Sequence, residues 1–339
     1  MMWERVRELI DGAPSVAGLR HHGLELLAAR IRREGGHSVP SDLRVDERRA
    51  AIRAVAAPVL LKRVRDAYDG SLVLIKGPEV AAHYPQPSVR TFCDLDLLVD
   101  DAYAAHRALT AAGFLEVGEA ARYHETHHLR PLALPGLPLF IELHHEPNRP
   151  QWLPAPPLGD LFELTEPSAT GVAGLRAPVR AVHALLIAAH SWAHEPLRRL
   201  LDLIDIGVLL RDSDRAIAAE LAERWGLQRV WATTIGAVDA VLDDGRPGLA
   251  PQVWARHLAA VRERTVLETH VTRWAGPVHG MPGTRVGALR SGTTIFMRAA
   301  RRREEERWAN AMRRTCLAVH HAFRPQSQHD LIKESRTGR

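Results

Sequence analysis

The segment DLDLLV at residues 94–99 limits the folds open to this chain more than any other part of the sequence. In an extended strand successive side chains point to opposite faces, so Asp94 and Asp96 share one face. Leu95 and Leu97 then point to the other face and enter the core. Two carboxylates this close repel each other unless a cation lies between them. Mg²⁺ is commonly held by one or two carboxylates together with substrate phosphates. The segment therefore predicts a buried strand with a metal site for a nucleotide.

A second motif precedes this strand and predicts a phosphate-binding turn. The apolar run at 71–75 is bounded by turn residues, which is typical of a buried strand. Lys76 and Gly77 follow it directly, and Pro78 and Glu79 are both favoured in the first turn of a helix. Strand, tight turn and helix is an arrangement that binds phosphate groups through its backbone.

Two cations near this turn are candidate phosphate ligands. Lys76 would place a point charge beside a triphosphate. Arg90, four residues before Asp94, could contact the same phosphates with its planar guanidinium. Two other interpretations stay open, namely that Lys76 is a surface lysine at a strand end and that Arg90 forms a structural ion pair with the acidic end of the strand.

The order of predicted elements indicates an α/β (α+β) fold with a mixed sheet flanked by helices. Apolar residues at three- and four-residue spacing predict helices over 23–33 and 46–68. Short apolar runs predict further strands at 114–117, 127–134 and 139–145, of which the last two form a hairpin.

The pattern changes to helical beyond the proline-rich stretch 147–157, so we predict a domain boundary there. The predicted divisions are an N-terminal helical region that packs on the core (1–70), the sheet core (71–150), an all-helical substrate domain (151–290), and a basic helix and tail (291–339).

Composition and charge exclude several classes of protein. The net charge is +5, but from Arg290 onward the chain holds twelve Lys/Arg and five Asp/Glu, so that segment carries +7 and the rest −2. The basicity is therefore remote from the carboxylates, and we do not expect a nucleic-acid partner. Two distant cysteines and no long apolar run predict a cytoplasmic protein without a membrane span. The sequence does not predict its oligomeric state.

Several motifs together resemble a known family. They are LIKG at 74–77, Tyr84-Pro85, Arg90 and DLDLLV at 94–99, with weaker similarity through IELH at 141–144 and HALL at 183–186 to Asp202. The chain resembles the bacterial uncharacterised nucleotidyltransferases, a branch of the DNA polymerase beta-like superfamily. This resemblance implies a nucleotidyltransferase-type sheet core and transfer of a nucleoside monophosphate from an NTP.

The resemblance also implies roles for particular residues. Asp94 and Asp96 would hold Mg²⁺ or Mn²⁺ against the triphosphate. Glu142 is the only acidic residue inside a later apolar strand, so it is the candidate for the third carboxylate, which would hold the second metal ion and help to remove the proton of the acceptor hydroxyl. An outward-facing Glu142 on an edge strand is the alternative. The superfamily has Ser or Gly after the turn glycine, whereas Pro78 here removes one backbone donor. Lys76 would compensate.

Histidines form the main competing signal. They are His124, His127, His128, His144, His145, His183, His190 and His194. His190 and His194 are spaced to share one helical face, a spacing that can bind zinc, although HExxH is absent. The resemblance places this helical part over the nucleotide, so these two residues, His144 and Asp202 are candidates for contact with the acceptor.

The acceptor implied by the resemblance is a small molecule or peptide, as in natural-product biosynthesis. Two other functions stay open. One is a nucleotide-binding protein that has lost transfer activity through the altered turn at Pro78, and the other is a metal-dependent hydrolase built on the histidines.

Overall fold

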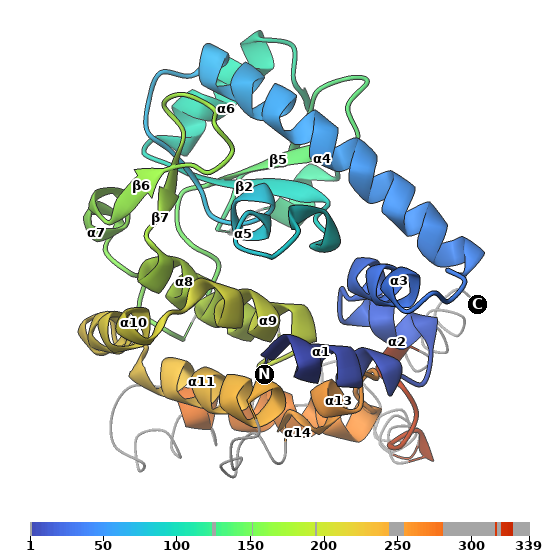
Figure 1. Ribbon diagram of the computed structural model, residues 1–339. Helices are drawn as coiled ribbons and strands as arrows, with labels where there is room; N and C mark the ends of the chain where they lie inside the picture. Colours follow the sequence, from blue (N-terminus) through green and yellow to red (C-terminus); the bar gives the residue numbers. More distant parts are fainter. Residues whose placement is uncertain are drawn as a thin grey trace.

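Figure 1 shows the protein as a computed structural model, which describes residues 2–123, 127–150, 152–193, 195–243, 254–280, 316 and 320–327. A sheet with its covering helices forms one end of the molecule, and a group of packed helices forms the other. The predicted mixed α/β fold with helices after the sheet is confirmed.

The described strands form one mixed sheet of seven strands in the order β3-β4-β5-β2-β1-β7-β6. They are β1 (Leu72–Leu74), β2 (Asp94–Val99), β3 (Leu115–Glu116), β4 (Leu132–Ala133), β5 (Phe140–His144), β6 (Thr165–Pro167) and β7 (Arg176–Pro178). β2 lies in the middle, antiparallel to β1 and parallel to β5. The predicted hairpin is present, because β4 pairs antiparallel with β5.

The sheet extends into a segment that the sequence assigned to the all-helical domain. β7 runs parallel to β1, with Arg176 opposite Val73, and β6 pairs antiparallel with β7. Each of these two strands has three residues and ends in a proline. Neither is long enough to show the alternation by which a strand is predicted. The sheet therefore includes residues on both sides of the proline-rich stretch.

Helices cover both faces of the sheet. On one face Leu95 packs with residues of α4 (Ser41–Ala67) and α6 (Ala102–Ala111). On the other face Leu98 packs with residues of α8 (Arg180–Ala193). Full burial of a leucine side chain contributes about 1.5–3 kcal/mol. With apolar packing on both faces, β2 is a rigid central support for its two aspartates.

The other helices surround these layers. They are α1 (Met2–Asp11), α2 (Val16–His21), α3 (Glu25–Glu34), α5 (Pro78–Ala81), α7 (Leu158–Glu163), α9 (Leu200–Leu209), α10 (Asp212–Arg224), α11 (Gln228–Leu242), α13 (Arg256–Ala259) and α14 (Val266–Gly280), with 3₁₀ turns η1 (Pro87–Val89) and η2 (Ala120–Tyr123). The helices predicted at 23–33 and 46–68 correspond to α3 and α4. α4 packs on the sheet, whereas α1 contacts α3 and α11 and so joins the helical end (Figure 1).

Most of the predicted basic tail at 291–339 lies outside the described residues. The part at 320–327 contacts the start of α14, where the Val266 backbone N–H donates to the carbonyl oxygen of Arg324. Among the described helices, none combines the length and the apolar character needed to cross a membrane.

Candidate active site

Two neighbouring strands place acidic side chains next to each other. β2 and β5 are parallel and in register, so Asp96 lies opposite Glu142 and Leu98 lies opposite His144. Because side chains alternate along a strand, Asp94 and Asp96 share a face with the two polar residues of β5. This face is the one toward α8, and it is where the structure brings the predicted third carboxylate beside the aspartates.

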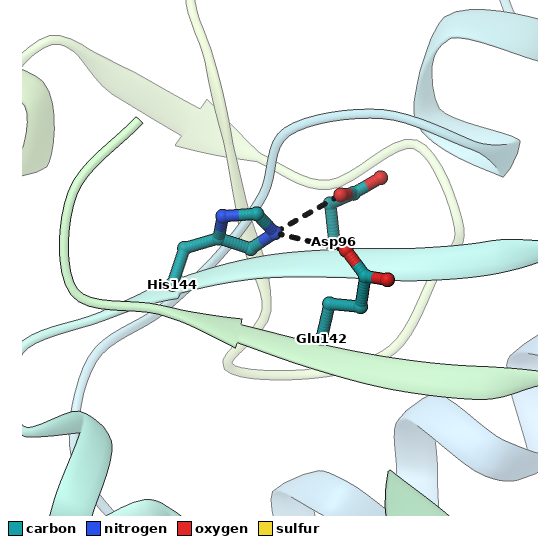
Figure 2. Close-up of side chains that lie close together, drawn as sticks. All are labelled: Asp96, Glu142 and His144. Carbon is teal, nitrogen blue, oxygen red and sulfur yellow. Dashed lines mark hydrogen bonds and ion pairs between the residues drawn. The ribbon is translucent and has the colours of Figure 1, made fainter. Parts of the chain in front are cut away.

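Asp96, Glu142 and His144 form a compact cluster (Figure 2). His144 Nε2 lies 3.0 Å from Asp96 Oδ1 and 3.7 Å from Glu142 Oε2. One ligand atom of each residue lies within 4.8 Å of the others, a spacing that could hold one metal ion. The side chains of His144 and Asp96 are 1% and 4% exposed, whereas that of Glu142 is 24% exposed. The cluster is therefore buried at its base and open at Glu142.

Lys76 connects this cluster to the helical end of the molecule. Its Nζ lies 3.7 Å from Asp96 Oδ1 and 3.0 Å from Nδ1 of His190 on α8. Burial opposes ionisation of Asp96, but the positive charge of Lys76 and the hydrogen bond with His144 outweigh it. They hold the Asp96 pKa well below its usual value, so this carboxylate is ionised at neutral pH.

The other two carboxylates have raised pKa values. Burial and the negative charge of Asp96 raise the pKa of Asp94. Burial, Asp96 and Asp94 raise the pKa of Glu142 to about 7. Carboxylates that raise one another's pKa values repel each other when ionised, and a bound cation would remove this repulsion. Such a cluster is typical of a cation-binding site.

The raised Glu142 pKa predicts a pH-dependent stability. Between pH 4.5 and about 7 the folded protein holds a proton on Glu142 that the unfolded chain has already lost. The free energy of unfolding of metal-free protein should therefore decrease as the pH rises through this range, by at most about 3 kcal/mol. Urea unfolding in EDTA at a series of pH values measures this change. Glu142→Gln should remove this pH dependence, whereas the control Glu166→Gln, at an exposed residue, should keep it. An unchanged pH profile in Glu142→Gln would show that Glu142 is not the group that titrates.

The turn after β1 has the geometry that its sequence predicts. Gly77 has φ +66° and ψ −126°, a conformation open to glycine and strained for other residues. Pro78 occupies the first position of α5, where its missing N–H breaks no helical hydrogen bond. The His183 ring contacts the Ile75 carbonyl oxygen at 2.8 Å, which fixes the end of β1 against α8.

The structure places Arg90 in a buried ion pair. Its Nε and Nη2 donate to the two carboxylate oxygens of Asp205 on α9, at 3.2 and 2.8 Å. Tyr84 Oη donates to the same carboxylate at 2.6 Å, and Arg90 Nη1 donates to the Gly77 and Thr91 carbonyl oxygens. Burial disfavours the charge, yet Asp205 raises the Arg90 pKa. Arg90 thus forms a structural ion pair, but with α9 rather than with the acidic strand end that the sequence left open, and its contacts hold the turn rather than present the guanidinium to a phosphate.

Two more of the histidines noted in the sequence also lie at the site. The rings of His127 and His128 lie 5.2 Å from that of His144, and His128 Nε2 is 3.8 Å from Glu142 Oε2. Burial, with the nearby His144, lowers the pKa of His127 to about 3. The sequence flagged these histidines but gave no reason to place them next to Glu142.

The helical end contributes polar groups on the far side of Lys76. His190 contacts Lys76, and Asp202 lies in the first turn of α9, where burial raises its pKa. His194 lies outside the described residues. Arg199 was not predicted from the sequence. It occupies the N-cap position of α9 without a capping hydrogen bond from its side chain, and its buried Nε has no hydrogen-bond partner in the described parts of the chain. A Cβ at Gly23 would lie 2.8 Å from Arg199 Nη2, so glycine there leaves room for the guanidinium.

The sequence that forms this sheet and site matches a known protein family. A family model described as "uncharacterised nucleotidyltransferase" matches residues 16–243, about two thirds of the chain. The chain belongs to this family. The match begins at α2 and ends just after α11, so the nucleotidyltransferase region includes the sheet, the candidate site and most of the helical end. No curated protein and no solved structure matches the chain.

Proposed function

We propose that the protein is a metal-dependent nucleotidyltransferase that moves a nucleoside monophosphate from an NTP to a hydroxyl or phosphate group of a small-molecule or peptide acceptor. The observation that carries this proposal is the meeting of Asp96, Glu142 and His144 beside Lys76, in a chain of the nucleotidyltransferase family. The acidic oxygens fit Mg²⁺ or Mn²⁺, which when bound would neutralise phosphate charge and favour ionisation of the acceptor hydroxyl.

The residues of the site have separate roles in the proposed reaction. Lys76 and the Gly77 turn bind the triphosphate, and Asp94 and Asp96 hold the metal that accompanies it. Glu142 accepts the proton of the acceptor hydroxyl. The acceptor oxygen bonds to the α-phosphorus as the bond from that phosphorus to pyrophosphate breaks, and pyrophosphate leaves. Positioning and charge stabilisation supply most of the acceleration in such a reaction.

The acceptor in this proposal faces the helical end. His190 and Asp202 approach the sheet from α8 and α9, and Arg199 adds a cation at the start of α9. His144 was also a candidate for acceptor contact, but its position next to Asp96 favours a role at the metal. These groups favour an acceptor with polar or charged functions, such as a peptide or an intermediate of natural-product biosynthesis.

Lys76→Ala should weaken NTP binding about 10- to 100-fold, since one charge-assisted hydrogen bond to a phosphate is worth about 1.5–3 kcal/mol. Lys62→Ala is a matched control, because Lys62 is exposed on α4 and pairs with Asp66. Titration calorimetry with each NTP in Mg²⁺ measures both variants. Equal NTP affinity in Lys76→Ala and in the wild type would remove Lys76 from the phosphate site.

The proposal is tested by incubating the protein with Mg²⁺, each labelled NTP and cell extract, and identifying by mass spectrometry which component gains a nucleotide. A mass increase of one NMP, with matching pyrophosphate release, is the expected result. The Asp96→Asn variant is the inactive control. If no component of the extract gains a nucleotide while NTP still binds, the proposed transfer activity is wrong.

A second function, nucleotide binding without transfer, is favoured by one observation. Pro78 offers no backbone N–H at the position after the turn glycine, so one potential phosphate donor is absent. In that case NTP would bind in a Lys76-dependent manner but no pyrophosphate would appear with any acceptor. Pro78→Ser restores the donor and should then raise NTP affinity.

A further inference from the structure

The cluster next to Lys76 contains a nitrogen donor, which a magnesium site does not require. Mg²⁺ prefers oxygen ligands, whereas imidazole nitrogen is a good ligand for Zn²⁺, Fe²⁺ and other first-row ions. Asp96 and Glu142 supply oxygen and His144 supplies nitrogen from adjacent strands (Figure 2). Asp94 is not a member of this cluster, so it remains for an ion that arrives with the NTP.

The distances in the cluster fit ligands of one ion. Ligands that bind at about 2.1 Å lie about 3.0 Å apart at right angles and about 3.4 Å apart at tetrahedral angles. His144 Nε2 is 3.0 Å from Asp96 Oδ1 and 3.7 Å from Glu142 Oε2. These two separations are close to the ideal ones, so an ion between His144 Nε2 and either carboxylate oxygen needs only small side-chain shifts, and all three ligand atoms lie within 4.8 Å of one another.

We propose that His144 Nε2 is a ligand of the ion held by Asp96 and Glu142, and that this position binds a first-row transition ion, Mn²⁺ among them, in preference to Mg²⁺. The purpose of the ion rests on the proposed function, but its binding does not. The nitrogen donor is the source of the preference, because affinity for an imidazole-containing site rises along the first-row series.

The tautomer of His144 is compatible with this role. In the metal-free protein the short contact from Nε2 to Asp96 Oδ1 places the ring proton on Nε2. When the ion binds, it takes the place of that proton, which moves to Nδ1 as in other metal-bound histidines. Nδ1 has no hydrogen-bond partner within the described residues, so no existing contact opposes the change of tautomer.

The surroundings of Glu142 also favour a cation. His128 Nδ1 lies 2.7 Å from the Leu129 carbonyl oxygen and so donates its proton there. In the neutral ring Nε2 then carries a lone pair, 3.8 Å from Glu142 Oε2. When Glu142 is ionised, its carboxylate and this lone pair repel each other, and a positive ion between them removes the repulsion.

The test measures metal binding without NTP. Mn²⁺ is titrated into chelator-treated full-length protein and detected by electron paramagnetic resonance, and Mg²⁺ is then added in competition. Pulsed spectra of the Mn²⁺ complex report directly whether a nitrogen atom is bonded to the ion. The variants are His144→Asn and, as the matched control, His145→Asn, which changes the next histidine outside the cluster.

We expect wild-type protein to show nitrogen coupling and to bind Mn²⁺ at least about 10-fold more tightly than Mg²⁺. His144→Asn should lose the coupling and most of the preference, and His145→Asn should keep both. Absence of nitrogen coupling in the wild-type complex, or an equal preference in His144→Asn, would overturn the proposal. The wild-type spectrum gives this answer even if His144→Asn folds poorly.

Failure of this inference and failure of the proposed function have different signatures. Nucleotide transfer with Mg²⁺ but no nitrogen-coupled Mn²⁺ would refute the ligand role of His144 and leave the transferase intact. Nitrogen-coupled Mn²⁺ with no transfer to any acceptor would support the ligand role and refute the transferase.

Discussion

Asp96→Asn should abolish nucleotide transfer, with a loss of at least about 1,000-fold in kcat, because asparagine keeps the shape of the side chain and removes the charge that holds the metal. Asp96 is the one carboxylate of the site whose pKa is held low, through Lys76 and His144. It is therefore ionised at neutral pH before any metal binds. Pyrophosphate release with saturating NTP and Mg²⁺ measures the loss.

The matched control for this experiment is Asp100→Asn. Asp100 follows β2 at the end remote from Lys76, where its carboxylate accepts a hydrogen bond from Tyr68 Oη. This variant should transfer nucleotide at the wild-type rate. Circular dichroism and an unfolding curve show whether each variant is folded. A folded Asp96→Asn protein that releases pyrophosphate at the wild-type rate would refute the metal-dependent mechanism.

Arg90→Met should lower the free energy of unfolding by about 3–5 kcal/mol, since it leaves the buried Asp205 carboxylate without its cation. Both side chains are almost fully buried, with 8% and 2% exposed. Among the described residues, only Tyr84 would still donate a hydrogen bond to the Asp205 carboxylate. Urea unfolding in EDTA measures the loss in the protein without nucleotide.

Two further variants separate the ion pair from other effects. Arg63→Met, on the exposed side of α4, should leave the unfolding midpoint close to that of the wild type. Arg90→Met combined with Asp205→Asn should cost less than Arg90→Met alone, because the uncompensated charge is gone. An Arg90→Met protein with normal stability and lost NTP affinity would instead support the phosphate contact that the sequence also allowed.

Local sequence patterns were enough to predict the central part of the fold. The alternation in DLDLLV predicted that Asp94 and Asp96 share one face of a buried strand, and β2 has that arrangement. Glu142 was predicted beside them because no other acidic residue interrupts a later apolar strand. The glycine turn could be predicted as well, since only glycine adopts the backbone angles of residue 77 without strain.

Tertiary structure alone decided which partner each charged or ionisable group has. Arg90 and Asp205 are 115 positions apart, and nothing local to either shows that they meet. The contact of His144 with Asp96 depends on the register of two parallel strands, and a shift of one residue would move His144 to the opposite face. β6 and β7 joined the sheet without a sequence pattern. Periodicity is a property of neighbouring residues, so the sequence by itself determined the strand and its acidic face. Strand register and buried ion pairs depend on the packing of distant segments, so only the folded chain determined the site.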